Sequence, residues 1–145
     1  MKKYILGLAM SALCFTALNA ANHEIKMQNK TADGTMTFDP IYLKANVGDT
    51  VTFKAVTKGH DAESVLVPDG AKPFKGKINE EITYTLEKEG VYVYLCTPHK
   101  AMNMTGIIQV GNAVNKAAAE AKINELDSKA ATNKGRLKKY AAQIK

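Results

Sequence analysis

Short segments with alternating apolar and polar residues recur along residues 22–110, and they restrict the fold more than any other feature of this chain. Thr, Val, Ile and Tyr are abundant in them, and the period-2 pattern is typical of β-strands that turn one face to a core. Turn-forming stretches such as "ADG", "NVGD" and "PDGAKP" separate the segments. About eight strands at this spacing predict an all-β, two-sheet sandwich with antiparallel or Greek-key connections. The expected strands are "HEIKM", "TMTF", "IYLKA", "TVTFKAV", "ESVLV", "ITYTL", "VYVYL" and "TGIIQV".

The same alternation predicts which side chains fill the core of the sandwich. Successive residues of a strand point to opposite faces, so every second apolar residue faces inward. The predicted core residues are Ile25, Met27, Phe38, Val51, Phe53, Val65, Tyr84, Leu86, Tyr92 and Tyr94.

The composition changes after Gly111. Residues 112–145 contain no alternating segment and are rich in Ala and Lys. Apolar residues at helical spacing predict two short α-helices, broken near Asp127 and Ser128, with Ser128 as the N-cap of the second. Isolated helices this short are marginal in water, so we expect both to pack on the sandwich. The positions with helical spacing are Val114, Ala117, Ala118 and Ala121, then Leu137, Tyr140, Ala141 and Ile144.

The first 20 residues have the pattern of a cleaved secretory signal peptide. Lys2 and Lys3 form a positive start, residues 5–18 are apolar and almost uncharged, and Ala20 supplies a small residue before the cleavage site. The apolar run is too short for a good membrane span. We therefore expect cleavage after Ala20, no stable membrane insertion, and export of the mature chain to a bacterial periplasm. The mature chain would consist of a β domain, residues 21–111, and the helical extension, residues 112–145.

Cleavage leaves one cysteine in the mature chain. The sequence has two, and Cys14 lies in the segment that is removed. Cys96 therefore has no partner for an internal disulfide in an oxidising compartment. Such a thiol is expected to be buried, reactive or bound to a metal.

The positive charge of the mature chain lies in the helical extension. Residues 112–145 carry eight basic and three acidic residues, a net charge of +5, whereas residues 21–111 carry ten and eleven, a net charge of −1. No basic patch is interleaved with aromatic residues, so the charge pattern does not predict a nucleic-acid partner.

The stretch "CTPHKAMNM", residues 96–104, collects three types of metal ligand between two predicted strands. The alternation along "VYVYLC" turns Cys96 toward the core, on the same face as the two tyrosines of that strand. A proline stiffens the loop, so that His99 can approach the thiol. A thioether from Met102 or Met104 completes the group at one end of the sandwich.

A second histidine would complete a metal site, and the sequence has three histidines. His23 lies beside the new N-terminus, where we expect a solvated side chain. His60 lies in the turn "TKGHDAES" between two predicted strands and is the candidate ligand. Two imidazoles, one thiolate and a weak axial thioether are the ligands of electron-transfer copper sites. Structural zinc sites rarely use a thioether, and iron–sulfur clusters need more thiolates.

These residues resemble those of the type I blue copper proteins, or cupredoxins, and in particular the pseudoazurins. The resemblance covers most of residues 22–145 and is carried by "KANVGDTVTF", "KGHDAES", "FKGKINE", "CTPHKAMNM" and the two-helix extension. It implies a cupredoxin sandwich that binds one copper ion. The shorter loop of amicyanin-like relatives would use Met102 as the axial ligand. The ligands that the pseudoazurin resemblance implies are His60, Cys96, His99 and Met104.

The resemblance also implies a function. The expected protein is a monomeric periplasmic electron carrier, which exchanges single electrons with redox proteins such as a cytochrome c-type donor and the copper nitrite reductase of denitrification. An enzyme is disfavoured, because the sequence offers one copper site without a second set of histidines, and a complete ligand set leaves no open position for a substrate. The alternatives are a copper trafficking or storage protein and an electron carrier to another periplasmic reductase. A strong visible band from a thiolate bound to copper(II) separates a carrier from a trafficking or storage protein.

Four positions depart from the residues that are common in the family: Asp61, Leu95, Lys100 and Asn103. In the family, the polar residue after the first ligand ties its turn to the cysteine loop. We therefore expect Asp61 to accept a hydrogen bond from Thr97.

We expect the docking surface for redox partners to surround the edge of His99. Leu95, Ala101 and Met102 would form an apolar patch there, ringed by lysines that steer an acidic partner. These lysines are Lys30, Lys58, Lys75, Lys77 and Lys100.

Overall fold

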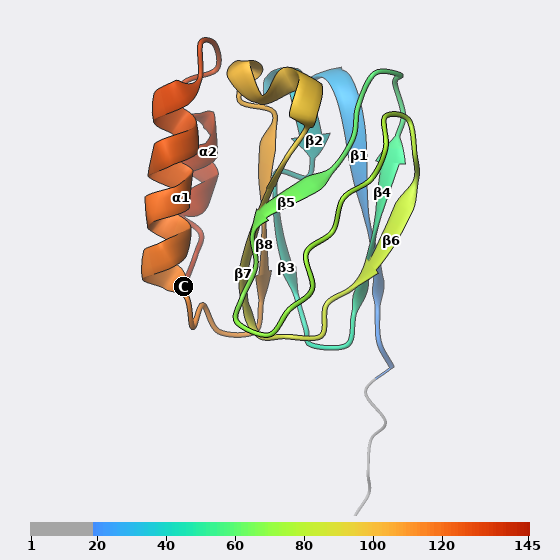
Figure 1. Ribbon diagram of the computed structural model, residues 1–145, viewed down its shortest axis with the longest axis vertical. Helices are drawn as coiled ribbons and strands as arrows, with labels where there is room; N and C mark the ends of the chain where they lie inside the picture. Colours follow the sequence, from blue (N-terminus) through green and yellow to red (C-terminus); the bar gives the residue numbers. More distant parts are fainter. Residues whose placement is uncertain (1–18) are drawn as a thin grey trace, which may run out of the picture.

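Eight strands are followed by two helices in the computed structural model, which describes residues 19–145 (Figure 1). The apolar part of the predicted signal peptide, up to Leu18, lies outside the described residues. A short 3₁₀ helix, η1 (Thr97–Met102), separates the last two strands. The strands are β1 (Asn22–Thr31), β2 (Gly34–Asp39), β3 (Tyr42–Ala45), β4 (Thr50–Ala55), β5 (Glu63–Leu66), β6 (Ile82–Thr85), β7 (Gly90–Leu95) and β8 (Thr105–Val110), and the helices are α1 (Lys116–Lys129) and α2 (Arg136–Ala141).

The strands form two four-stranded sheets, in the orders β2-β1-β4-β6 and β3-β8-β7-β5. The pairs β1–β4 and β3–β8 are parallel, whereas the other pairs are antiparallel. Parallel pairs join strands that are not consecutive, so the chain crosses between the sheets instead of forming only hairpins. The predicted strands and the two-sheet sandwich are confirmed.

Aromatic rings fill the space between the sheets. Phe38, Phe53 and Tyr94 are at most 1% exposed. The ring centroid of Tyr94 lies 4.8 Å from that of Phe38 and 5.1 Å from that of Phe53, both in edge-to-face arrangements. The predicted core is confirmed except at two positions. Val65 and Tyr84 are only partly buried, because β5 and β6 are edge strands.

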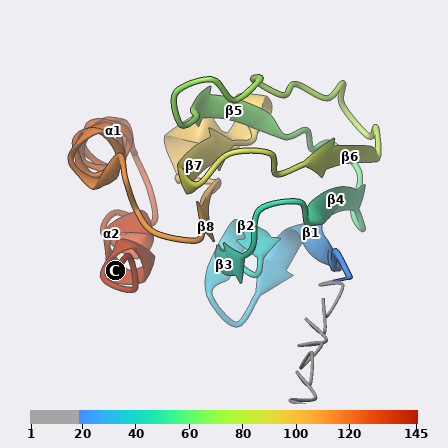
Figure 2. The same ribbon diagram turned by 90° about the horizontal axis from the view of Figure 1, so that it is seen from below.

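A second apolar layer lies between the outer face of β7–β8 and the two helices (Figures 1 and 2). Val93 and Ile107 pack there with Ile123 of α1 and Leu137 of α2, and each is at most 2% exposed. Full burial of a side chain of this size contributes ~1.5–3 kcal/mol. The predicted packing of the extension is confirmed, and it explains why "GVYVYL" is apolar on both faces.

The break between the helices lies later than predicted. α1 continues through Asp127 and Ser128, and α2 begins only after Gly135. The prediction that Ser128 caps the second helix is wrong, because its hydroxyl donates to the carbonyl of Glu125 at 2.7 Å, within α1. The buried carboxylate of Asp127 accepts a hydrogen bond from the backbone N–H of Gly135 at 2.7 Å. The position of the break between the helices therefore depends on this tertiary contact of Asp127 and not on a local capping preference.

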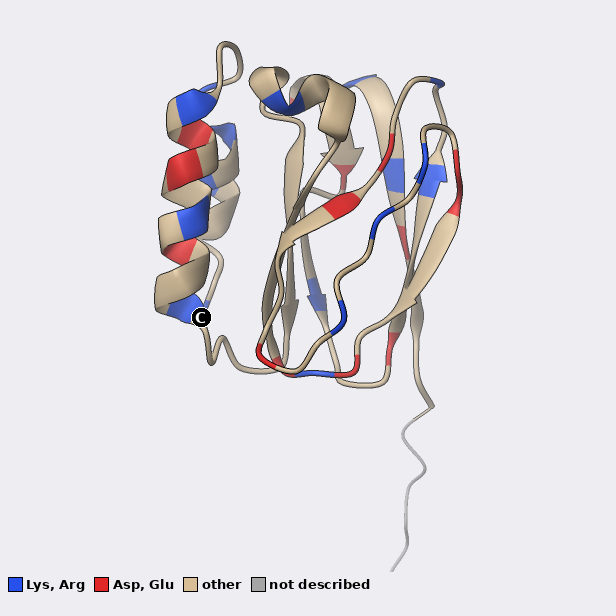
Figure 3. Ribbon diagram, in the orientation of Figure 1, with Lys and Arg blue, Asp and Glu red and all other residues tan. Residues whose placement is uncertain are grey.

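The buried face of α1 also differs from the prediction. Val114 precedes the helix and is 67% exposed, and the three alanines predicted beside it are exposed as well. The buried residues are Ala119, Ile123 and Asp127. The outer side of α1 carries both charge signs along its length (Figure 3). No helix among residues 19–145 is long and apolar enough to cross a bilayer.

Candidate metal centre

The transition from β7 into η1 holds Cys96 and His99. Cys96 directly follows the strand and is fully buried, as its place in the alternation predicts. Pro98 lies in the first turn of η1, where the missing N–H leaves no hydrogen bond unmade. The N–H of His99 donates to the carbonyl of Cys96 at 3.1 Å, so the short helix folds the partly exposed imidazole back beside the thiol.

His60 lies in the turn between β4 and β5, and Asn79 braces this turn. Gly59 has a φ of 97°, which glycine adopts without steric cost, and its N–H donates to the side-chain oxygen of Asn79 at 2.7 Å. The N–H of Asn79 in turn donates to the carbonyl of His60 at 2.8 Å. The imidazole of His60 is fully buried as a result. Sequence analysis did not identify Asn79.

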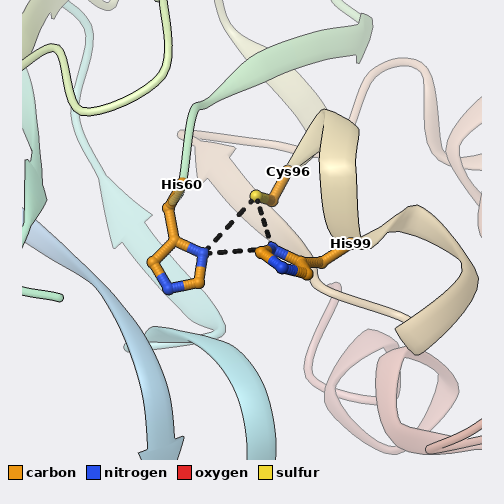
Figure 4. A group of neighbouring side chains, drawn as sticks. All are labelled: His60, Cys96 and His99. Atoms are coloured by element: carbon orange, nitrogen blue, oxygen red, sulfur yellow. Dashed lines mark hydrogen bonds between the residues drawn. The ribbon is translucent and has the colours of Figure 1, made fainter. Parts of the chain in front are cut away.

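Three donor atoms converge at this end of the sandwich (Figure 4). Sγ of Cys96 lies 3.7 Å from Nδ1 of His60 and 3.4 Å from Nδ1 of His99, and the two Nδ1 atoms lie 3.2 Å apart. Ligands that bind one ion at ~2.0–2.3 Å in a trigonal set are separated by ~3.5–4 Å. The observed separations fit a shared metal ion after small adjustments, so the structure brings the predicted thiol and both predicted imidazoles together.

Asn29 on β1 orients the ring of His60. Its side-chain oxygen lies 2.8 Å from Nε2 of His60, and the hydroxyl of Thr57 lies 3.2 Å from the same atom. An Nε2–H that donates to the amide oxygen leaves Nδ1 with a free lone pair that points to the other two ligands. Sequence reasoning missed Asn29. A buried ligand histidine requires an acceptor for its second ring nitrogen, but the sequence does not indicate which strand supplies it.

Burial shifts the pKa of two of these residues. The pKa of His60 is lowered, first by burial and then by the neighbouring His99 ring, which favours the neutral imidazole that binds metals. Burial raises the pKa of the Cys96 thiol to about 11, while a hydrogen bond from the backbone of Asp61 acts in the opposite direction. Metal binding must displace the thiol proton, so the affinity of the site for a metal rises with pH.

The two methionines of the loop lie in different surroundings. Met104 is fully buried and belongs to the same apolar cluster as Cys96, whereas Met102 is partly exposed. The N–H of Cys96 donates to the carbonyl of Met104 at 2.9 Å, and the N–H of Met104 donates to the carbonyl of His99 at 3.3 Å. The backbone of Met104 is therefore tied to two of the converging residues, which favours it as the source of an axial thioether.

Asn103 fits the loop through its backbone conformation and through contacts with the extension. Its φ of 54° is in the left-handed region, which Asn adopts more readily than most residues. The side-chain amide is buried and donates to the carboxylate of Asp127 at 3.0 Å and to the carbonyl of Asn133 at 2.9 Å. The polar groups of the Asn103 side chain are therefore satisfied, although this residue departs from the one that is common in the family. Sequence analysis missed Asp127 and Asn133 as its partners.

Two other predictions need correction. His23 is not a freely solvated residue: its Nε2 lies 2.8 Å from the buried carboxylate of Asp49, outside the converging group. Leu95 was expected in an exposed apolar patch but is only 7% exposed. It lines a hollow together with Ala101 and Leu126, so only Ala101, which is exposed, and Met102, which is partly exposed, remain of the expected patch.

Residues 25–111 match the model of the copper binding proteins of the plastocyanin/azurin family. The chain is 45% identical over 114 residues to a putative pseudoazurin from Rhizobium leguminosarum bv. viciae, covering 76% of this chain and 75% of that protein. It is 41% identical over 113 residues to a pseudoazurin from Paracoccus pantotrophus, covering 74% and 78%. The crystal structure of a pseudoazurin from Hyphomicrobium denitrificans superimposes with a TM-score of 0.72 at 37% identity, covering 86% of this chain and 99% of that one.

Proposed function

Because this chain belongs to the plastocyanin/azurin family of copper-binding proteins, and within it to the pseudoazurins, we propose that it is a carrier of single electrons with one type I copper ion. The convergence of one thiol sulfur and two Nδ1 atoms within 3.7 Å of one another is the observation that carries this proposal. The proposed ligands are His60, Cys96, His99 and Met104.

Each ligand has its own task in this proposal. The copper ion, when bound, supplies a one-electron couple. Cys96 provides the soft anionic ligand, the two imidazoles complete the strong ligands, and Met104 provides a weak axial thioether. The hydrogen bond between Asn29 and His60 and the short helix under His99 hold these groups in place, so little rearrangement accompanies a change of oxidation state. Four protein ligands leave no open position for a substrate, which supports a carrier and not an enzyme.

The proposed partners are other redox proteins, namely copper nitrite reductase as the acceptor and a cytochrome c-type protein as the donor, and the carrier itself acts as a monomer. His99 is partly exposed at the metal end, so its ring edge provides the shortest path between the site and a partner. Lys58 and Lys100 are exposed and lie within two residues of a proposed ligand, and Lys77 is exposed two residues before Asn79, which contacts the turn of His60. These positions support electrostatic steering of an acidic partner.

The proposed location is the periplasm, after removal of residues 1–20. Residues 21–111 then form the copper domain, and residues 112–145 form the extension. The backbone N–H of Ala21 donates to the carboxylate of Asp49 at 2.9 Å. Cleavage after Ala20 would convert this N–H into an α-ammonium beside a buried carboxylate, which supports that cleavage site. N-terminal sequencing of the exported chain should begin at Ala21, and a start at another residue would move the boundary.

Absorption and EPR spectra of the purified copper(II) protein test the proposed function. We expect an intense visible charge-transfer band from the Cys96 thiolate to copper(II), and we expect its loss in the Cys96→Ser variant, since a hydroxyl is a harder and less acidic ligand. A chain that binds copper without this band would contradict the carrier and support a trafficking or storage role.

A further inference from the structure

The helical extension reaches into the metal-binding loop through Arg136. This residue begins α2 and is buried, with 9% of its surface exposed. Its guanidinium donates to the carbonyl of Asn103 at 2.7 Å and to that of Met102 at 3.2 Å. The same group donates to the carbonyls of Thr35 and Met36, at 2.8 and 2.6 Å, and so links the loop to β2.

The charge of Arg136 is satisfied by carbonyl oxygens. No carboxylate among residues 19–145 lies within 4.0 Å of its guanidinium nitrogens. Burial lowers the pKa of its guanidinium, and this cost is offset by the hydrogen bonds to the backbone. A surface helix that only covers a sheet does not need a buried cation at its first residue. The position of Arg136 therefore points to a role at the loop.

The linker between the helices contacts the same stretch of loop. The N–H of Ala131 donates to the carbonyl of Ala101 at 2.7 Å, and the side chain of Asn133 donates to the carbonyl of Met102 at 2.9 Å. Together with the bond from Arg136 to Asn103, three consecutive loop carbonyls each accept a hydrogen bond from residues 131–136. These three residues immediately precede Met104.

We propose that residues 131–136, and Arg136 in particular, position the axial thioether of Met104 and thereby tune the copper site. This inference rests on the proposed function. The sandwich fixes the Cys96 end of the loop, whereas the extension fixes the backbone that leads into Met104. A looser backbone at Asn103 would lengthen the contact between the thioether and the metal. A weaker axial donor stabilises copper(II) less, so the reduction potential would rise and the visible spectrum would change.

Two variants of Arg136 separate this role from general stabilisation. Arg136→Met keeps an apolar side chain of similar length without donors, and Arg136→Lys keeps the charge but not the planar group that reaches several carbonyls at once. Leu137→Ala is the matched control, because Leu137 is fully buried in the layer between helices and sheet and is not bonded to the loop carbonyls. It is expected to destabilise the extension by ~2–5 kcal/mol.

The readouts are the ratio of the visible bands, the EPR spectrum and the reduction potential of the copper-loaded proteins. We expect both Arg136 variants to raise the potential and change the band ratio, with the larger effect for Arg136→Met, while Leu137→Ala lowers the unfolding midpoint and leaves the spectrum as in the parent. In a Met104→Leu background, the Arg136 changes should have no further effect on the potential. Spectra of the Arg136 variants that match the parent or the Leu137→Ala control would overturn the inference. If the parent chain lacks the thiolate band, the proposed function fails instead.

Discussion

The backbone N–H of Thr97, the residue after Cys96, donates to the carboxylate of Asp61, the residue after His60, at 2.6 Å. This bond confirms the expected link between the histidine turn and the cysteine loop. Asp61 is 5% exposed, so its negative charge is poorly screened by water. An asparagine at this position could form the same bond without the charge.

Asp61→Asn is expected to raise the reduction potential of the copper protein. The side-chain oxygen of Asn can still accept the Thr97 hydrogen bond, while the loss of a nearby negative charge removes a preference for copper(II). Protein-film voltammetry measures the shift. Glu63→Gln is the control, because Glu63 also accepts a bond from Thr97, at 3.0 Å, but its side chain is 29% exposed. A potential that is unchanged or lower in Asp61→Asn would contradict the expectation.

Removal of the acceptor for His60 is expected to weaken metal binding. In Asn29→Ala, Nε2 of His60 loses the oxygen that lies 2.8 Å away, so the ring is no longer fixed with Nδ1 toward Cys96. Loss of such a partner typically lowers metal affinity ~10–100-fold. A competition titration with a copper chelator measures this ratio. Gln28→Ala, on the same strand but hydrogen-bonded to Asp39, should leave the affinity unchanged, and equal effects of both variants would speak against the assignment.

The axial ligand is tested by paired substitutions at the two methionines. Met104→Leu should raise the reduction potential and alter the visible spectrum, because a buried thioether near Cys96 is lost. Met102→Leu should leave the spectrum nearly unchanged and affect the kinetics with partners, since Met102 is partly exposed beside His99. The reverse result would assign the axial position to Met102.

The strands and the buried position of Cys96 at the end of one of them could be predicted because both depend on local pattern. The alternation in "VYVYLC" placed Cys96 inside, and the eight strand segments were correct, since one buried face imposes period 2. The helix break was predicted wrongly because Asp127, a polar residue, is buried against Asn103, 24 residues away. Asn29 and Arg136 were missed for the same reason: their partners come from other elements, and a single sequence does not show such pairings.

Asp49 is expected to make stability depend on pH in the acid range. Its pKa is lowered to about 2, first by the backbone N–H of Asn46 and then by His23 and the N–H of Ala21. A lowered folded-state pKa means that the carboxylate stabilises the fold above the unfolded value near 4, and that this contribution is lost as the pH falls toward 2. The free energy of unfolding, measured in urea, should be lower at pH 3 than at pH 7. The Asp49→Asn substitution should reduce this difference by about 1–2 kcal/mol.

The control for this experiment is Asp69→Asn, since Asp69 is exposed in a loop. It should preserve the full pH dependence. The expectation would be contradicted if the parent protein and the Asp49→Asn variant showed the same difference in unfolding free energy between the two pH values. The contacts of Asp49 would then not contribute to the pH dependence of stability.

The lysines at the metal end are expected to accelerate association with an acidic redox partner. Lys58, Lys77 and Lys100 are exposed and form no ion pair with residues 19–145, whereas Lys75 lies 3.4 Å from Glu63. Unpaired positive charges around a partly exposed His99 attract a negative surface over a range set by the Debye length, ~10 Å at 0.1 M salt and ~3 Å at 1 M. Stopped-flow rates with copper nitrite reductase should therefore fall as the ionic strength rises.

Lys58→Gln should lower the association rate at low salt and reduce its salt dependence, because one steering charge at the metal end is removed. Lys88→Gln removes the same charge from an exposed position just before β7, at the other end of the sandwich, and should change the rate little. The limiting rate of electron transfer at saturating partner should stay the same in both variants, since neither lysine is a proposed ligand. Rates that are independent of salt, or equally reduced in both variants, would mean that the lysines near His99 do not guide docking.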